Sequence, residues 1–304
     1  MLEGQKCLVI GSGISGIGAV ALLEKYHADV VLYDSSDKLT KEDLEAKLPG
    51  ESKAVCIAGE LPEEVELSIQ ATVLSPGVPT DIPLVNRMRD RGVQILGEIE
   101  LGFLAEQGRV IAITGTNGKT TTTTLTGEIM KAHFGAEKTF VVGNIGNPYT
   151  LEVTKTSKDS VTVGEISSFQ LETIHTFHPV VSAILNITPD HLNRHHTMEA
   201  YVAAKEAVAS QQTKADICVL NYDNDYTRDF AGRCPATPVL FSSHQELENG
   251  YFLRGDKIIK SVNGEEHELM DIHKDMNLVG LCNVENVMAA IAIAEGMQVP
   301  METI

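Results

Sequence analysis

Residues 110–124 read VIAITGTNGKTTTTT and carry more chemical information than any other stretch of the chain. An apolar run, 110–113, leads into Gly115-Thr116-Asn117-Gly118-Lys119-Thr120, and a helix-compatible segment, 125–134, follows. A strand, a glycine turn and a helix N-terminus direct backbone N–H groups and the helix dipole at a phosphate. In such a loop the lysine reaches the outer phosphates and the following hydroxyl faces Mg²⁺. We predict these two roles for Lys119 and Thr120.

The glycine spacing differs from that of the usual phosphate loop, whose first glycine comes five residues before the second. Ile113 holds that position here, and Gly115 comes two residues later. The alternative interpretation is a threonine-rich turn that only closes a β–α unit. We favour the phosphate loop, because Gly-Lys-Thr directly after an apolar strand is a rare coincidence.

A second glycine loop, Gly11-Ser12-Gly13-Ile14-Ser15-Gly16, lies between a predicted strand, 6–10, and a helix ending near Tyr26. The next strand, 29–33, ends at Asp34, which is the layout of a dinucleotide fold. The pattern specifies only a diphosphate near a helix end and a carboxylate that accepts hydrogen bonds. It therefore fits a nucleotide sugar as well as NAD, and a turn that only packs helix on strand remains an alternative.

Other predicted strands also end in polar or turn-forming residues. Strand 71–74 runs into Ser75-Pro76-Gly77, a rigid turn that we place at the edge where ligands bind in open α/β sheets. Strands 139–142, 160–163 and 181–185 lead to Asn144, Glu165 and His191. Carboxylates beside a phosphate loop suit Mg²⁺, which prefers oxygen ligands and substrate phosphates. We expect His195 and His196 to lie in a solvent-facing loop.

Composition bounds the remaining possibilities. A length of 304 residues favours two domains, and we place them at 1–97 and 98–304, with 97–108 as the crossing segment. The net charge of −18 argues against a nucleic-acid partner. Five scattered cysteines indicate reduced thiols in the cytoplasm, and neither a leader nor a membrane span is evident. The expected class is α/β: a Rossmann-like domain, then a P-loop ATPase-type domain with a mainly parallel sheet.

The motifs as a set resemble the Mur ligase family over nearly the whole chain. They are Gly-Thr-Asn-Gly-Lys-Thr, Gly-Asn-Ile-Gly, Glu-Ile-Ser-Ser-Phe-Gln-Leu-Glu and Asn-Ile-Thr-Pro-Asp-His, in that order. Within the family, the first glycine loop and the Ser-Pro-Gly-Val-Pro turn are most similar to the branch that adds D-glutamate. The resemblance implies ATP-dependent ligation of D-glutamate to UDP-N-acetylmuramoyl-L-alanine through an acyl phosphate, in peptidoglycan synthesis by a monomeric bacterial enzyme.

The resemblance also implies residue roles. The residues that it implies for binding the uridine nucleotide sugar are Ser12, Gly13, Ile14, Ser15, Asp34, Ser35, Ser75, Gly77, Asn144, Ser167, Gln170 and His191. The residues that it implies for binding ATP are Gly115, Thr116, Asn117, Gly118, Lys119, Thr120, Thr121, Asn283 and Asn286, the last two on the adenine side. The implied Mg²⁺ ligands are Thr120, Glu165, His191 and Lys205, the last as a carbamate. The implied catalytic residues are Lys119, Glu165, His191 and Lys205. Composition alone makes Lys205 a solvated lysine on an amphipathic helix.

Two departures from the family pattern stand out. Cys282 replaces the histidine that usually precedes Asn283. The family's third, C-terminal domain is absent from this chain, so we expect substrate binding without turnover. The alternatives are another Mur-type or folate-type ligase, an NAD-dependent dehydrogenase built on the first loop, and a nucleotide-binding module without catalysis.

Overall fold

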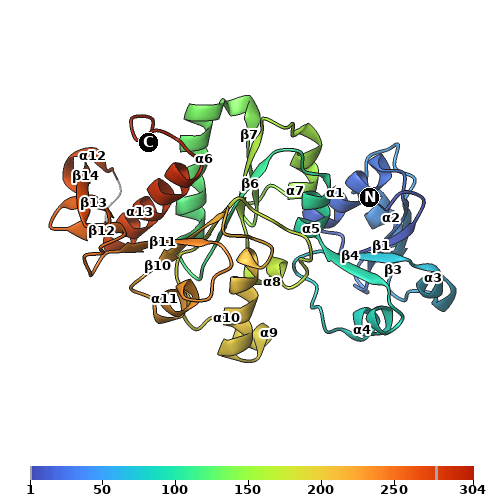
Figure 1. Ribbon diagram of the computed structural model, residues 1–304. Coiled ribbons are helices and arrows are strands. Elements are labelled where there is room, and N and C mark those ends of the chain that lie inside the picture. The colour runs from blue at the N-terminus through green and yellow to red at the C-terminus, as the bar shows by residue number, and fades with distance from the viewer. Residues whose placement is uncertain (1, 278–279) are drawn as a thin grey trace. The chain divides into compact units, whose positions relative to one another are not determined.

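The computed structural model describes residues 2–277 and 280–304 and divides them into two compact units (Figure 1). Unit 1 runs to Glu106 and includes Gly146–Lys155 and Phe169–Phe177; unit 2 holds the remaining segments, up to Ile304. The two units therefore alternate along the chain. The predicted division into 1–97 and 98–304 stays a prediction.

Unit 1 is built on a five-stranded parallel sheet with the order β3-β2-β1-β4-β5. The strands are β1 (Lys6–Ile10), β2 (Asp29–Asp34), β3 (Val55–Ala58), β4 (Ala71–Leu74) and β5 (Gln94–Gly97). Leu8, Val31 and Met88 belong to its buried core. The strands predicted at 6–10, 29–33 and 71–74 are confirmed, apart from a shift of one residue at the end of the second.

The helices of unit 1 follow the strand ends in the alternation expected of a parallel sheet. They are α1 (Ile14–Lys25), α2 (Lys41–Glu45), α3 (Glu63–Ser68), α4 (Pro83–Asp90), α5 (Glu98–Ala105) and α7 (Tyr149–Glu152), followed by the 3₁₀ turn η2 (Val153–Lys155). The short helix α8 (Ser168–Leu171) begins at the last residue of a unit 2 segment and continues in unit 1.

Helix α5 occupies the segment that the sequence marked as a crossing between domains. Two of its glutamates are almost fully buried: Glu98 accepts hydrogen bonds from Thr150 N and Oγ1 at 2.7 and 2.8 Å, and Glu100 accepts from the backbone N–H groups of His175 and Thr176. These bonds hold two later segments against α5 within unit 1. The sequence alone does not indicate that these glutamates are buried, because their hydrogen-bond partners lie far along the chain.

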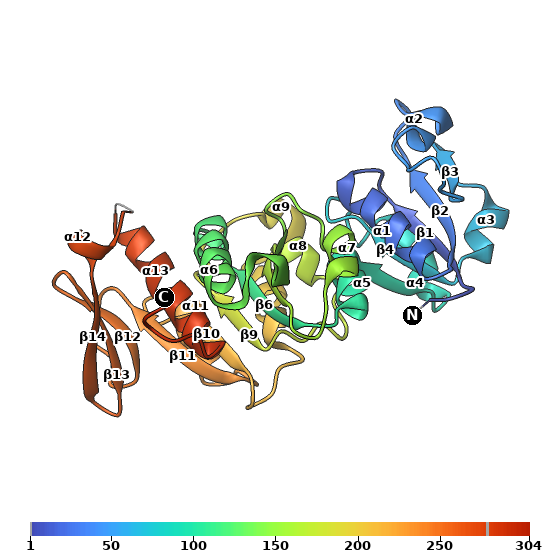
Figure 2. The same ribbon diagram turned by 90° about the horizontal axis from the view of Figure 1, so that it is seen from above.

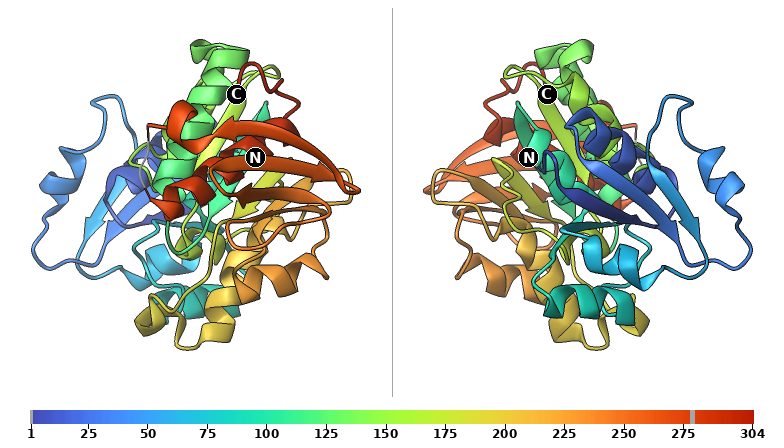
Figure 3. Two further views of the ribbon diagram at one scale, coloured as in Figure 1. Left: turned by 90° about the vertical axis from the view of Figure 1, so that its left-hand side faces the viewer. Right: turned by 90° about the vertical axis from the view of Figure 1, so that its right-hand side faces the viewer.

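Unit 2 contains a nine-stranded sheet with the order β14-β13-β12-β11-β10-β9-β6-β8-β7. The strands are β6 (Arg109–Thr114), β7 (Thr139–Gly143), β8 (Val161–Glu165), β9 (Val181–Ile184), β10 (Ile217–Asn221), β11 (Thr237–Ser242), β12 (Gly250–Arg254), β13 (Lys257–Val262) and β14 (Glu265–Asp271). Pairing is parallel from β7 to β12 and antiparallel from β12 to β14. The predicted α/β class with a mainly parallel sheet is confirmed, and Figure 3 (left) shows the antiparallel strands, in orange and red, toward the viewer.

Two long helices, α6 (Lys119–Phe134) and α13 (Leu281–Gly296), pack together on one face of this sheet (Figures 1 and 2). Helices α10 (Met198–Glu206) and α11 (Asp225–Ala231) lie on the other face (Figure 1). Met288 and Ile291 of α13 belong to the same buried core as Ile111 and Val219 of the strands. The remaining helical segments are η1 (Ala136–Lys138), α9 (Leu192–His195), η3 (Ala207–Ala209) and α12 (Ile272–Asp275). Within the described residues, every helix is too short or too polar to cross a membrane.

Candidate active site

The loop between β6 and α6 has the geometry of a phosphate-binding turn. Gly118 is the N-cap of α6 with φ +84°, a left-handed conformation that favours glycine. A Cβ atom at this position would lie 2.2 Å from Oδ1 of Asn286, so the loop also needs glycine for close approach. The first N–H groups of α6 have no acceptor inside the helix, and the helix dipole adds positive potential there. The loop is therefore suited to an anion.

Asn186, two residues after β9, fixes the shape of this loop. Its backbone carbonyl accepts from Thr116 N at 2.9 Å, and its side chain accepts from Asn117 N at 2.8 Å and donates to Asn117 O at 3.1 Å. Asn186 is the first residue of the Asn-Ile-Thr-Pro-Asp-His motif, but its residue type and position alone indicate no role. Three hydrogen bonds with this one residue hold the loop in place.

Two lysines meet at the carbonyl of Gly115. Lys119 Nζ donates to Gly115 O and to Thr116 O, both at 2.9 Å, and Lys205 Nζ donates to Gly115 O at 2.8 Å. Burial lowers the pKa of Lys119, and the charges of Glu165 and Asp190 oppose that shift. The loop thus brings two amino groups to one backbone carbonyl.

Lys205 is only 1% exposed, on helix α10. Burial, and then the charge of Lys119, lower its pKa to about 7, although Asp190 acts in the opposite direction. Its Nζ lies 4.7 Å from the ring centre of Tyr201, whose hydroxyl hydrogen-bonds Thr116 Oγ1 at 3.0 Å. The solvated position suggested by composition is wrong, whereas the resemblance pointed to this site.

Glu165, at the end of β8, is 1% exposed. Its Oε1 accepts from Asn144 Nδ2 at 2.7 Å, and its buried Oε2 has no hydrogen-bond partner among the residues that the structure describes. An orphaned carboxylate oxygen is costly to bury, and a cation ligated by it removes that cost. The Thr120 hydroxyl, at the exposed start of α6, adds an oxygen donor. This donor chemistry fits a hard divalent cation such as Mg²⁺.

The loop after β9 carries His191, which the resemblance assigns to the site, and Asp190, which it does not. His191 has φ +52°, caps α9 and lies with Nε2 3.5 Å from Asp190 Oδ2. Asp190 was part of the motif but received no role. Its charge nevertheless acts on Lys119, on Lys205 and on Tyr201. Asp190 is therefore a site residue that sequence reasoning missed.

His195 corrects a second expectation. It is 6% exposed, and its Nε2 lies 2.9 Å from Oγ of Ser168, which is also buried; His196 is exposed as expected. The His195 ring lies 5.1 Å from the ring of Tyr201. A solvent-facing loop is therefore wrong for His195. The contact links α9 to the start of α8, next to Ser167.

We expect His195→Ala to lower the free energy of unfolding by about 2–4 kcal/mol, because it opens a cavity and leaves the buried Ser168 hydroxyl without this partner. Urea unfolding followed by circular dichroism measures the change. His196→Ala is the matched control and should stay within about 0.5 kcal/mol of the parent. Equal effects of the two substitutions would contradict the buried contact.

The glycine loop of unit 1 is hydrogen-bonded to Asp34. Asp34 Oδ2 accepts from Ser12 N at 3.0 Å and from Ser12 Oγ at 2.7 Å, and Lys47 Nζ donates to Ser12 Oγ at 2.9 Å. Burial by itself raises the pKa of Asp34, but hydrogen bonds from Ser12 and Ser36 and the charge of Lys47 outweigh it, so the pKa lies below its ordinary value. Asp34 is thus an anionic acceptor beside a helix N-terminus.

The β4 turn contacts the same loop. Ser75 Oγ donates to Gly11 O at 3.1 Å, and a Cβ at Gly16 would lie 1.9 Å from Gly11 O, which explains the glycine there. Of the other residues that the resemblance assigned, Gly13, Ile14, Ser35, Gly77 and Asn144 are exposed, Ser15, Ser167, Thr121 and Asn283 are half-buried, and Gln170 and Asn286 are buried. Their roles as ligand contacts stay predictions.

Comparisons with known proteins agree over the whole chain. The family description "Mur ligase middle domain" matches residues 113–294, and "Mur ligase MurD-like, N-terminal domain" matches residues 5–97. The chain is 52% identical over 303 residues to the UDP-N-acetylmuramoylalanine–D-glutamate ligase of Lachnospira eligens, and 42% identical over 305 residues to that of Clostridioides difficile. Each alignment covers 100% of this chain and 66% of the relative, so the chain spans about two thirds of the relatives' length.

Solved structures show the same fold at low identity. The UDP-N-acetylmuramate:L-alanyl-gamma-D-glutamyl-meso-diaminopimelate ligase from Neisseria meningitidis aligns with a TM-score of 0.61 at 15% identity, covering 98% of this chain and 95% of that one. The UDP-N-acetylmuramate-alanine ligase from Thermotoga maritima aligns with a TM-score of 0.56 at 19% identity, covering 98% of this chain and 66% of that one.

Proposed function

The chain belongs to the Mur ligase family, and from that premise we propose that it serves the ATP-dependent addition of D-glutamate to UDP-N-acetylmuramoyl-L-alanine in peptidoglycan synthesis. One observation carries the proposal: the chain has two separate glycine loops that each lead into a helix N-terminus, one beside Asp34 in unit 1 and one at Lys119 in unit 2. A dehydrogenase needs only the first loop. A ligase that joins a nucleotide sugar to an amino acid with ATP needs both.

The chemistry follows from the poor reactivity of a carboxylate. Transfer of the outer phosphate of ATP converts the substrate carboxylate to an acyl phosphate and releases ADP. The amine of D-glutamate then attacks the acyl carbon, phosphate leaves with the C–O bond electrons, and the amine gives up a proton. No enzyme nucleophile is required. The protein contributes positioning and electrostatic stabilisation.

We assign the phosphate end of the site to residues with fitting chemistry. Lys119 balances the negative charge that moves from ATP to the acyl phosphate. Glu165, His191, Thr120 and a carbamate on Lys205 would hold Mg²⁺, which supplies charge neutralisation between phosphates when bound. The adenine side falls to Asn283 and Asn286, at the start of α13. The buried Glu165 Oε2 supports the cation in this assignment.

We assign binding of the uridine nucleotide to the loop of Ser12, to Asp34 and to the turn at Ser75. The proposal includes a cytoplasmic monomer that works on small molecules, without a nucleic-acid or membrane partner. Because the chain spans 66% of its relatives' length, we propose substrate binding for these 304 residues and full turnover for the longer arrangement of the relatives.

The first test is ligand-dependent thermal unfolding. UDP-N-acetylmuramoyl-L-alanine at a hundredfold excess over its Kd should stabilise the folded state by about 2.7 kcal/mol, and NAD should give no shift. In a second arm the chain is incubated with ATP, Mg²⁺, the UDP-sugar and D-glutamate, and the product is sought by mass. A shift with NAD alone would overturn the proposal, and ready product formation would show that these 304 residues suffice.

A further inference from the structure

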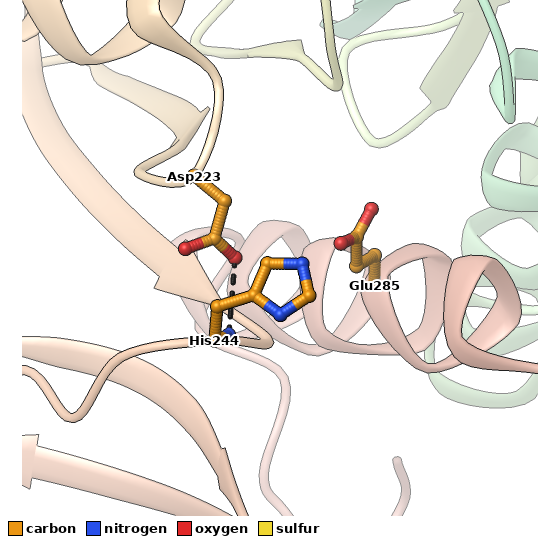
Figure 4. A group of neighbouring side chains, drawn as sticks. All are labelled: Asp223, His244 and Glu285. Carbon is orange, nitrogen blue, oxygen red and sulfur yellow. Dashed lines mark hydrogen bonds between the residues drawn. The ribbon is translucent and has the colours of Figure 1, made fainter.

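Three side chains with metal-ligating groups converge in unit 2, and none of them is among the residues assigned to Mg²⁺. Asp223 follows β10, His244 follows β11, and Glu285 lies near the start of α13; one ligand atom from each lies within 4.8 Å of the others (Figure 4). In Figure 4 the His244 ring lies between the two carboxylates. No motif in the sequence predicts this cluster, because its members are separated by more than twenty residues.

The carboxylates are held in place by hydrogen bonds from the chain. Asp223 Oδ1 accepts from Ser242 Oγ at 2.6 Å, and Oδ2 accepts from Ser243 N at 2.7 Å and His244 N at 3.3 Å. Glu285 Oε1 accepts from Ser243 Oγ at 2.6 Å. These bonds fix both carboxylates beside one serine and leave lone pairs on their oxygens. The exposed imidazole of His244 can rotate toward them.

The charge of the cluster is uncompensated. Neither Asp223 nor Glu285 forms an ion pair with a lysine or arginine in the described part of the chain. Both side chains are half-buried, where repulsion between like charges is less screened than at an open surface. The whole chain already carries a net charge of −18. A bound cation would relieve the repulsion at this point.

We propose that Asp223, His244 and Glu285 bind a divalent transition-metal ion of the Zn²⁺ class. One imidazole nitrogen and two carboxylate oxygens are a donor set that suits Zn²⁺ and Co²⁺, whereas Mg²⁺ prefers oxygen ligands alone. Bonds of about 2.0–2.2 Å to the metal require the three ligand atoms to move closer together, and the exposed His244 side chain supplies that movement. A fourth position stays open for water.

The ion would link three elements at the carboxyl edge of the sheet. Asp223 and His244 come from the loops after β10 and β11, and Glu285 lies between Asn283 and Asn286 on α13. The inference stands on these residues alone and does not depend on the ligase proposal. Its expected consequence is a stiffer start of α13.

The test is a Co²⁺ titration of the 304-residue chain, freed of metal with a chelator and carrying His191→Ala to remove the histidine that we assign to the Mg²⁺ site. Visible absorbance should show saturable binding of one Co²⁺ per chain, and Zn²⁺ should displace it. In this background His244→Ala should weaken binding at least tenfold, and Glu285→Gln, which keeps the shape of the side chain, should also weaken it. His273→Ala, an exposed histidine of the same unit, is the control and should leave the Kd unchanged.

Melting curves show whether each variant is folded, and an exposed His244 makes loss of folding unexpected. Absence of saturable Co²⁺ binding in the His191→Ala background would overturn the site. An unchanged Kd in both His244→Ala and Glu285→Gln would also overturn it, because the ion would then lie elsewhere. Parallel loss in His273→Ala would indicate nonspecific histidine binding, and it would count against the proposal in the same way.

Discussion

Lys119→Ala is expected to weaken ATP binding by roughly 10²–10³-fold. Two unit charges about 4 Å apart attract by about 4 kcal/mol at an effective dielectric near 20, and a charge-assisted hydrogen bond is lost with them. Lys119 Nζ is already held at the loop by the carbonyls of Gly115 and Thr116, so its charge is in place before a ligand arrives. Isothermal titration calorimetry with ATP and Mg²⁺ measures the change.

Two controls separate this effect from a general loss of structure. Lys131→Ala removes a partly exposed lysine of the same helix, which pairs with Glu128 at 2.8 Å, and should leave the ATP affinity within about threefold, since ion pairs at the surface contribute little. Binding of the UDP-sugar to Lys119→Ala should match the parent. An ATP affinity of Lys119→Ala close to that of Lys131→Ala would rule out the phosphate loop.

Lys205 should make the stability of the chain depend on pH. Its pKa of about 7 in the folded state lies below the ordinary value of 10.5, so the unfolded chain binds more protons between these two values. Stability therefore rises with pH from about 7 to about 10.5, and the full penalty applies below pH 7. At about 1.4 kcal/mol per tenfold change in proton affinity, the rise is at most roughly 5 kcal/mol.

Lys205→Met keeps an apolar chain of similar length and removes the titrating group. The variant should be more stable than the parent at pH 7, and its free energy of unfolding should lose most of the rise toward pH 10. Urea unfolding in bicarbonate-free buffer at several pH values gives both numbers. Lys131→Met is the control, and a pH dependence of Lys205→Met equal to that of the control and the parent would contradict the burial argument.

The same low pKa prepares Lys205 for carbamylation. Above pH 7 the neutral amine attacks CO₂, a bond forms between Nζ and the carbon, and a proton is released. The product is an anion, so repulsion from Lys119 becomes attraction. Intact mass under non-acidic conditions in bicarbonate should show one added CO₂ per chain and none in Lys205→Met. Unmodified lysine at pH 8 in bicarbonate would exclude a stable carbamate in this chain.

The sequence by itself determined the parts of the protein that depend on neighbouring residues. The strand, turn and helix around Gly118-Lys119 were predictable, because alternating apolar runs and glycine turns act within about twenty residues. The glycine loop before Asp34 was predictable for the same reason. The motif order around Asn144, Glu165 and His191 identified the family, since each motif is a continuous stretch of chain.

Only the tertiary structure decided which polar groups are buried. Lys205 reaches Gly115 across 90 residues, His195 reaches Ser168 across 27, and Asp223 meets Glu285 on another element. A polar side chain reads as solvent-exposed in a sequence, because burial without a partner is unfavourable and the partner is not visible locally. Once the fold supplies the partner, burial shifts the pKa of Lys205 and leaves an oxygen of Glu165 for a cation, and both properties arise from contacts between distant residues.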